Sequence, residues 1–106
     1  MELTLKEAQA LVENWINTIG NGYFSELTNM VLLTEETGEL ARIIARTYGD
    51  QIAKDGDMKK NLGEEMADVL WVLLCLANQT GTDLTGEFIK TLEKKKKRDA
   101  TRFQNK

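Results

Sequence analysis

Two pairs of acidic residues lie inside apolar sequence with helical periodicity. Glu36 and Glu39 form the first pair, and Glu65 and Asp68 form the second. A spacing of three residues places both carboxylates of a pair on the same face of a helix. Carboxylates in apolar surroundings are costly unless something neutralises them, and four together would hold only with protons or bound cations. We therefore expect the two helices to pack together around a cation.

Helical periodicity and end signals predict four helices in this chain of 106 residues, which contains no proline. The first begins at a capping box of Thr4 and Glu7 and stops at the glycines 20 and 22. The second is expected at about 25–48 with Ser25 as its N-cap, and the third at about 58–80. The fourth is expected at about 83–103, with Asp83 or Thr82 as its cap. Short connections favour antiparallel neighbours. The expected fold is therefore an all-α, four-helix antiparallel bundle, with residues 1–106 as a single domain.

The third predicted helix is apolar on nearly every side. From Met66 to Ala77 its only polar side chain is that of Asp68. A helix of this kind is buried on nearly all sides. In so short a chain, the pattern predicts burial against a second subunit, and hence an oligomer.

Composition excludes several kinds of protein. Without histidine there is no Ser-His-Asp triad and no imidazole zinc site, and the single cysteine, Cys75, forms no intramolecular disulfide and is expected in the core. A net charge of -3 gives no general attraction to nucleic acid or anionic membranes. The apolar run at 69–77 is too short to span a bilayer, and the N-terminus does not read as a signal peptide. We expect a cytoplasmic protein.

Simpler interpretations compete with a metal site. Glu36 and Glu39 could be surface residues of an amphipathic helix, and Asp68 could pair with Arg42 or Arg46. Aspartate is a poor helix former, however, and Asp68 lies in the most apolar stretch of the chain. Two such pairs on neighbouring helices favour a metal site, and hard oxygen ligands select magnesium, with manganese as the alternative.

The sequences around the acidic pairs carry a family resemblance. A Glu-Glu-x-x-Glu-Leu-Ala motif at 35–41 and a Glu-Glu-x-x-Asp-Val-Leu motif at 64–70 resemble the MazG-like nucleotide pyrophosphohydrolases of the all-α NTP pyrophosphatase group. The similarity continues at 22–25, 73–78 and 97–103. One departure is the lysine run at 94–97, where short relatives often carry an asparagine. It bears on the choice of nucleotide and leaves the metal ligands untouched.

The resemblance implies cleavage of the α–β phosphoanhydride of a (deoxy)nucleoside triphosphate to the monophosphate and pyrophosphate. It implies a role in cleansing the nucleotide pool and a homodimer or homotetramer whose active sites are shared between subunits. Magnesium would be bound by Glu36, Glu39, Glu65 and Asp68.

Further residues are candidates for binding the substrate. Arg98 and Arg102 lie one turn apart and can grip phosphates as a fork, unless they form only a solvated basic helix end. Lys54 is a candidate for closing over the triphosphate. Tyr23 and Phe24 are expected to stack on the base.

Two tryptophans and two glutamates complete the set of predictions. Trp15 and Trp71 are expected in the core. Glu35 and Glu64 are candidates for the base that takes a proton from the attacking water.

Two other functions stay open. The same site could act on another nucleotide phosphoanhydride, such as a nucleotide sugar, or the chain could be a non-catalytic, nucleotide-binding oligomerisation module. The complete set of four acidic positions favours an enzyme over the module.

Overall fold

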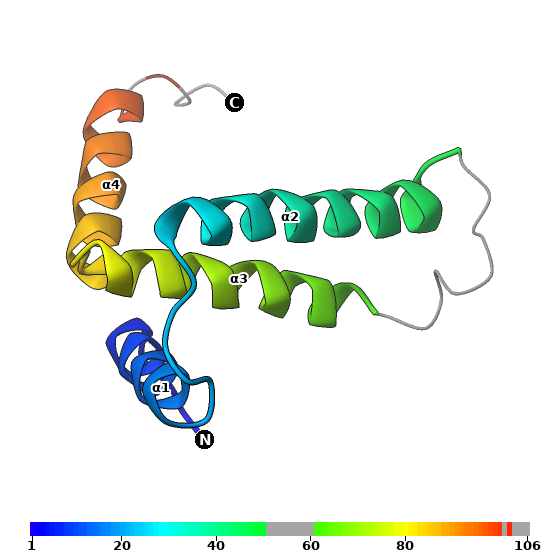
Figure 1. Cartoon of the computed structure of the whole chain (residues 1–106). Coiled ribbons are helices and arrows are strands. Elements are labelled where there is room, and N and C mark those ends of the chain that lie inside the picture. The colour runs from blue at the N-terminus through cyan, green and yellow to red at the C-terminus, as the bar shows by residue number, and fades with distance from the viewer. Residues whose placement is uncertain (51–60, 101, 103–106) are drawn as a thin grey trace.

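Four α-helices and no strands make up the part of the chain that the computed structural model describes, which is residues 1–50, 61–100 and 102 (Figure 1). They are α1 (Leu5–Thr18), α2 (Glu26–Tyr48), α3 (Leu62–Gln79) and α4 (Leu84–Asp99). The predicted all-α fold is confirmed. None of these helices is both long and apolar enough to cross a membrane.

Side-chain caps define the starts of α1 and α2. The backbone N–H of Glu7 donates to Thr4 Oγ1 over 3.1 Å, and Thr4 N–H donates to Glu7 Oε1 over 3.0 Å. This is the predicted capping box, which satisfies two backbone donors reciprocally. Ser25 caps α2 by accepting from Thr28 N–H over 3.1 Å, as the sequence indicates.

Two predicted boundaries are wrong. The third helix begins at Leu62 and not at 58, because Asn61 Oδ1 accepts from the N–H of Glu64 over 2.7 Å and acts as the N-cap. Residues 58–60 lie outside the described residues. The fourth helix ends at Asp99 and not at 103. After Asp99 the chain forms a turn, in which the N–H of Arg102 donates to the Asp99 carbonyl over 3.2 Å.

The start of α4 is capped from another helix. Asp83, one of the two predicted candidates, is the N-cap residue, but its side chain makes no capping hydrogen bond. The N–H of Leu84 donates instead to Oε1 of Gln9 on α1, over 3.0 Å. This contact ties α4 to α1 at one end.

The helices α2 and α3 lie side by side and antiparallel, with α1 packed next to α3 and α4 standing across the end of α3 (Figure 1). The main apolar core joins α1 to α3 through Val12, Ile16, Leu74 and Cys75. The predicted burial of Cys75 is confirmed.

Much apolar surface remains exposed on α3 and α4 within one chain. Met66, Leu70 and Leu73 of α3 are between 40% and 51% exposed. The helix α4 has no buried residue, and Phe88 is 64% exposed. The apolar surface of α3 is the one that the sequence assigns to a second subunit, and that assignment stays a prediction.

Candidate active site

Three of the predicted ligands converge between α2 and α3. Carboxylate oxygens of Glu36, Glu65 and Asp68 all lie within 4.8 Å of one another. Glu65 is only 1% exposed, and Glu36 and Asp68 are half-buried. Oxygen donors at this spacing suit a hard divalent cation, so these residues can bind a metal ion.

The other acidic candidates lie around this cluster. Glu39 is half-buried on α2 but is not a member of the group of three. Like charges repel, so bringing a fourth carboxylate onto the other three would raise the energy of the protein. Glu35 and Glu64 are exposed, and Glu64 faces its own helix cap, with its Oε1 accepting from Asn61 over 3.4 Å.

A cavity of about 260 Å³ adjoins the acidic cluster and is walled by α1, the α1–α2 connection, α2 and α3. Leu32 and Val72 line it. Leu32 lies one helical turn before Glu36, and Val72 lies one turn after Asp68, which corresponds to roughly 5–6 Å along each helix. The cavity and the cluster therefore lie about one helical turn apart between α2 and α3.

Both predicted base-binding residues, Tyr23 and Phe24, line this cavity. The Tyr23 hydroxyl accepts from Nδ2 of Asn78 over 3.1 Å. Burial of the hydroxyl, together with its hydrogen bond to Glu13, raises the pKa of Tyr23 to about 12. Tyr23 therefore keeps its proton at neutral pH and presents an uncharged wall.

The two tryptophans are not core residues. Trp15 and Trp71 are 41% and 39% exposed and line the cavity, with ring centroids 5.3 Å apart and planes at 84°. Such an edge-to-face pair is a favourable aromatic arrangement. The prediction placed them in the core because each has apolar neighbours at helical spacing, a pattern that a cavity wall shares.

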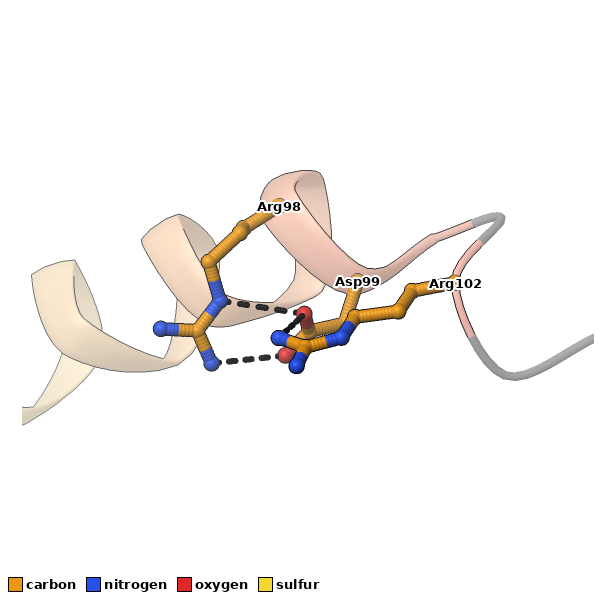
Figure 2. Close-up of polar contacts among 3 residues, drawn as sticks. All are labelled: Arg98, Asp99 and Arg102. Carbon is orange, nitrogen blue, oxygen red and sulfur yellow. Dashed lines mark hydrogen bonds and ion pairs between the residues drawn. The ribbon is translucent and has the colours of Figure 1, made fainter.

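The predicted phosphate-binding arginines, Arg98 and Arg102, lie away from the acidic cluster of the same chain. Both contact Asp99 at the end of α4 (Figure 2): Arg98 Nη2 lies 2.7 Å from Oδ2, and Arg102 Nη1 lies 3.4 Å from Oδ1. The hydrogen bonds from Arg98 lower the pKa of Asp99. Since α4 leaves the far end of α3, which is roughly 20 Å from Glu65, these groups do not face the acidic cluster of their own chain. Lys54 lies outside the described residues.

Sequence reasoning missed three amide side chains at this site. Asn29 lines the cavity, and its Nδ2 donates to Gln79 Oε1 over 2.7 Å. Asn78 and Gln79 hold the segment before α2, through Tyr23 and the Phe24 carbonyl. A signal for Asn29 was present, because it lies two helical turns before Glu36 on the same face of α2.

These features define an all-α protein with an acidic cluster between two antiparallel helices and an aromatic cavity beside it. Residues 24–103 match the MazG nucleotide pyrophosphohydrolase domain. The chain belongs to this family. Membership supports hydrolysis of a nucleotide pyrophosphate linkage as its activity.

Individual relatives agree with this assignment. The YpjD protein of Bacillus subtilis (strain 168) is 41% identical over 103 residues, which cover 97% of this chain and 93% of that protein. The crystal structure of YPJD from Bacillus subtilis superposes with a TM-score of 0.79, covering 88% of this chain and 93% of the other. A Bacillus-conserved MazG protein, a nucleotide pyrophosphohydrolase, is 36% identical with a TM-score of 0.73, covering 88% of this chain and 90% of the other.

Proposed function

We propose that this protein is a magnesium-dependent enzyme that cleaves the α–β phosphoanhydride of a (deoxy)nucleoside triphosphate. The products are the nucleoside monophosphate and pyrophosphate. The observation that carries the proposal is the acidic cluster of Glu36, Glu65 and Asp68, about one helical turn from an aromatic cavity. A nucleotide can place its base in the cavity while its phosphates reach the carboxylates.

The cluster would hold the metal ion. Glu36, Glu65 and Asp68 supply three hard oxygen donors, and Glu39 is the proposed fourth, because it lies three residues after Glu36 on the same face of α2. When bound, magnesium neutralises phosphate charge and lowers the pKa of a coordinated water. Manganese satisfies the same donors.

The proton of the attacking water needs an acceptor. Glu35 and Glu64 are exposed and lie outside the group of three carboxylates. Their position favours a carboxylate of the cluster, or Glu39 beside it, as the general base.

The base would lie against Tyr23 and Phe24, with Trp15 and Trp71 at the rim. Aromatic walls bind a base by stacking and by burying apolar area, so they tolerate many bases. Tyr23 is anchored to α3 by Asn78, which keeps this wall in register with the cluster on α2 and α3.

Assembly into a homodimer or homotetramer completes the proposal. The exposed apolar side chains of α3 and α4, such as Leu70 and Phe88, form a surface that a second copy would bury. A second copy would also bring its own Arg98 and Arg102 toward the phosphates. In one subunit these two residues lie at the outer end of α4 (Figure 2).

The experiment is a product analysis on a panel of NTPs and dNTPs, with and without magnesium. We expect magnesium-dependent formation of monophosphate and pyrophosphate, resolved by ion-exchange chromatography. In ¹⁸O-water, the label should enter only one of the two products. Release of orthophosphate and a diphosphate would contradict the proposed bond.

Magnesium binding can be checked without turnover. Added magnesium should raise the melting temperature of the protein, since a ligand at 100 times its dissociation constant stabilises the folded state by about 2.7 kcal/mol. A melting temperature that does not respond to magnesium, with an active enzyme, would remove the cluster from the proposal.

A further inference from the structure

Asn29 is a buried amide in the wall of the aromatic cavity. It is 4% exposed and lines the cavity. Among the described residues that line the cavity, Asn29 alone carries a carboxamide. A polar group buried beside apolar side chains costs free energy unless its donors and acceptors find partners, so its orientation here decides what the cavity can accept.

Neighbouring groups determine the orientation of the Asn29 carboxamide. The Phe24 carbonyl can only accept, and Nε2 of Gln79 donates to it. Glu26 Oε1 accepts from the same Nε2 over 3.4 Å. Because Nε2 is held on these acceptors, the Oε1 atom of Gln79 is turned to Asn29, whose Nδ2 donates to it over 2.7 Å.

The consequence is a defined polarity in the cavity wall. Nδ2 of Asn29 is engaged by Gln79, which does not line the cavity, so Oδ1 is the atom of this carboxamide left for a ligand in the cavity. A carboxamide oxygen has two acceptor lone pairs. A ligand that offers an N–H at this position is favoured, and a ligand that offers a carbonyl oxygen there would place two acceptors against each other.

We propose that Asn29 is a specificity-determining residue and that it selects nucleobases with an exocyclic amino group. Cytosine would be preferred over uracil, and adenine over hypoxanthine, since in each pair an amino donor takes the place of a carbonyl acceptor at the exocyclic position. Gln79 is the positioning residue that keeps the acceptor of Asn29 toward the base. The inference rests on the proposed function, because it takes the cavity to be the base site.

The test uses two substitutions and a matched control. Asn29→Leu replaces the amide by an apolar side chain of similar size and removes the acceptor. Gln79→Met leaves Asn29 in place but removes the group that orients it. Asn17→Leu makes the same chemical change as Asn29→Leu on the exposed face of α1.

Binding is measured by calorimetry in magnesium buffer, with the α,β-imido analogues of dCTP and dUTP, which resist cleavage at the proposed bond. We expect the wild type to bind the cytosine analogue roughly 10- to 100-fold more tightly. In Asn29→Leu this ratio should fall close to unity through weaker binding of the cytosine analogue. Asn17→Leu should keep the wild-type ratio.

Turnover of dCTP and dUTP gives a second readout. Gln79→Met should raise KM for dCTP with kcat little changed, because the amide no longer holds its orientation when the base binds. A loss of general structure would lower kcat for both substrates alike. If Asn29→Leu does not fold, as judged by its helical circular dichroism, the ratio of KM for dUTP to KM for dCTP in Gln79→Met decides the inference.

The outcomes separate the two proposals. A wild type that binds both analogues equally, or an Asn29→Leu variant that keeps the preference, overturns the inference while the pyrophosphatase proposal stands. Selective binding without pyrophosphate release overturns the proposed function and supports Asn29 as the selector of the base. Failure to bind either analogue overturns both.

Discussion

The helices α3 and α4 have similar lengths, 18 and 16 residues, but very different surroundings. Five residues of α3 are buried, among them the carboxylate of Glu65, whereas α4 buries none. The acidic cluster of Glu36, Glu65 and Asp68 is formed within a single chain. The apolar and basic surfaces of α4 remain available for contacts outside the chain.

The charged groups of the two helices differ in the same way. Glu65 is 1% exposed, and a buried carboxylate is kept against a free-energy cost, which is typical of functional sites. Arg98 is largely exposed and contacts Asp99, its neighbour in sequence (Figure 2). An exposed ion pair of this kind adds little stability, so Arg98 can exchange Asp99 for another anion at little cost.

The largest effect should come from removing one charge of the α3 cluster. Asp68→Asn keeps the size of the side chain but weakens its binding to a cation, and we expect pyrophosphate release to fall at least about 100-fold. Turnover assays with circular dichroism as a fold check measure this. Asp83→Asn, the same change at an exposed position at the start of α4, should keep wild-type activity. Equal activity of the two variants would show that Asp68 of α3 matters no more to the reaction than Asp83.

A charge on the apolar face of α4 should act through assembly. Phe88 is 64% exposed in one chain, and burying such a side chain in an interface is worth about 1.5–3 kcal/mol. Phe88→Asp should therefore raise the dissociation constant of the oligomer at least roughly 10-fold, measured by light scattering across a dilution series. Lys90→Ala, on the same helix, is the control. An unchanged assembly would show that this face of α4 is not an interface.

The basic end of α4 should contribute less than the acidic cluster. Arg98→Gln removes one charged donor, and we expect KM for the triphosphate to rise roughly 10-fold with kcat nearly retained. Steady-state kinetics above and below the oligomer dissociation constant measure the effect. If the effect of the substitution is the same in dissociated protein, Arg98 does not act across subunits.

The effect expected from Tyr23 is confined to high pH and leaves activity at neutral pH untouched. Its pKa is raised from 10.0 to about 12, so the folded state holds this proton more tightly than the unfolded state does. Stability from this group is complete below pH 10 and is lost as the pH rises toward 12. Chemical denaturation across this range should show the loss in the wild type, and Tyr23→Phe should remove this contribution. An identical pH profile for both proteins would contradict it.

Local signals account for what the sequence predicted correctly. The capping box of Thr4 and Glu7 and the cap at Ser25 involve residues three apart, so they are readable without tertiary structure. The convergence of Glu65 and Asp68 follows from their spacing on one helix face. The start of α3 was misplaced although Asn61 and Glu64 carry the same kind of local signal.

Contacts between distant segments account for the features that the sequence did not predict. The hydrogen bond from Asn29 to Gln79 joins residues 50 positions apart, and no spacing rule reaches that far. The position of Glu39 outside the group of three depends on its side-chain direction, which the spacing from Glu36 does not determine. Trp15 and Trp71 show that apolar periodicity identifies an inward face but does not separate a filled core from the wall of a cavity.

The cavity has one practical consequence for spectroscopy. The chain contains two tryptophans, and both line this cavity. Its tryptophan fluorescence therefore originates at the proposed base site, and a stacked nucleobase should quench it. The occupancy of the cavity can then be followed in real time on the unlabelled wild-type protein, and stopped-flow mixing would separate nucleotide entry from the chemical step.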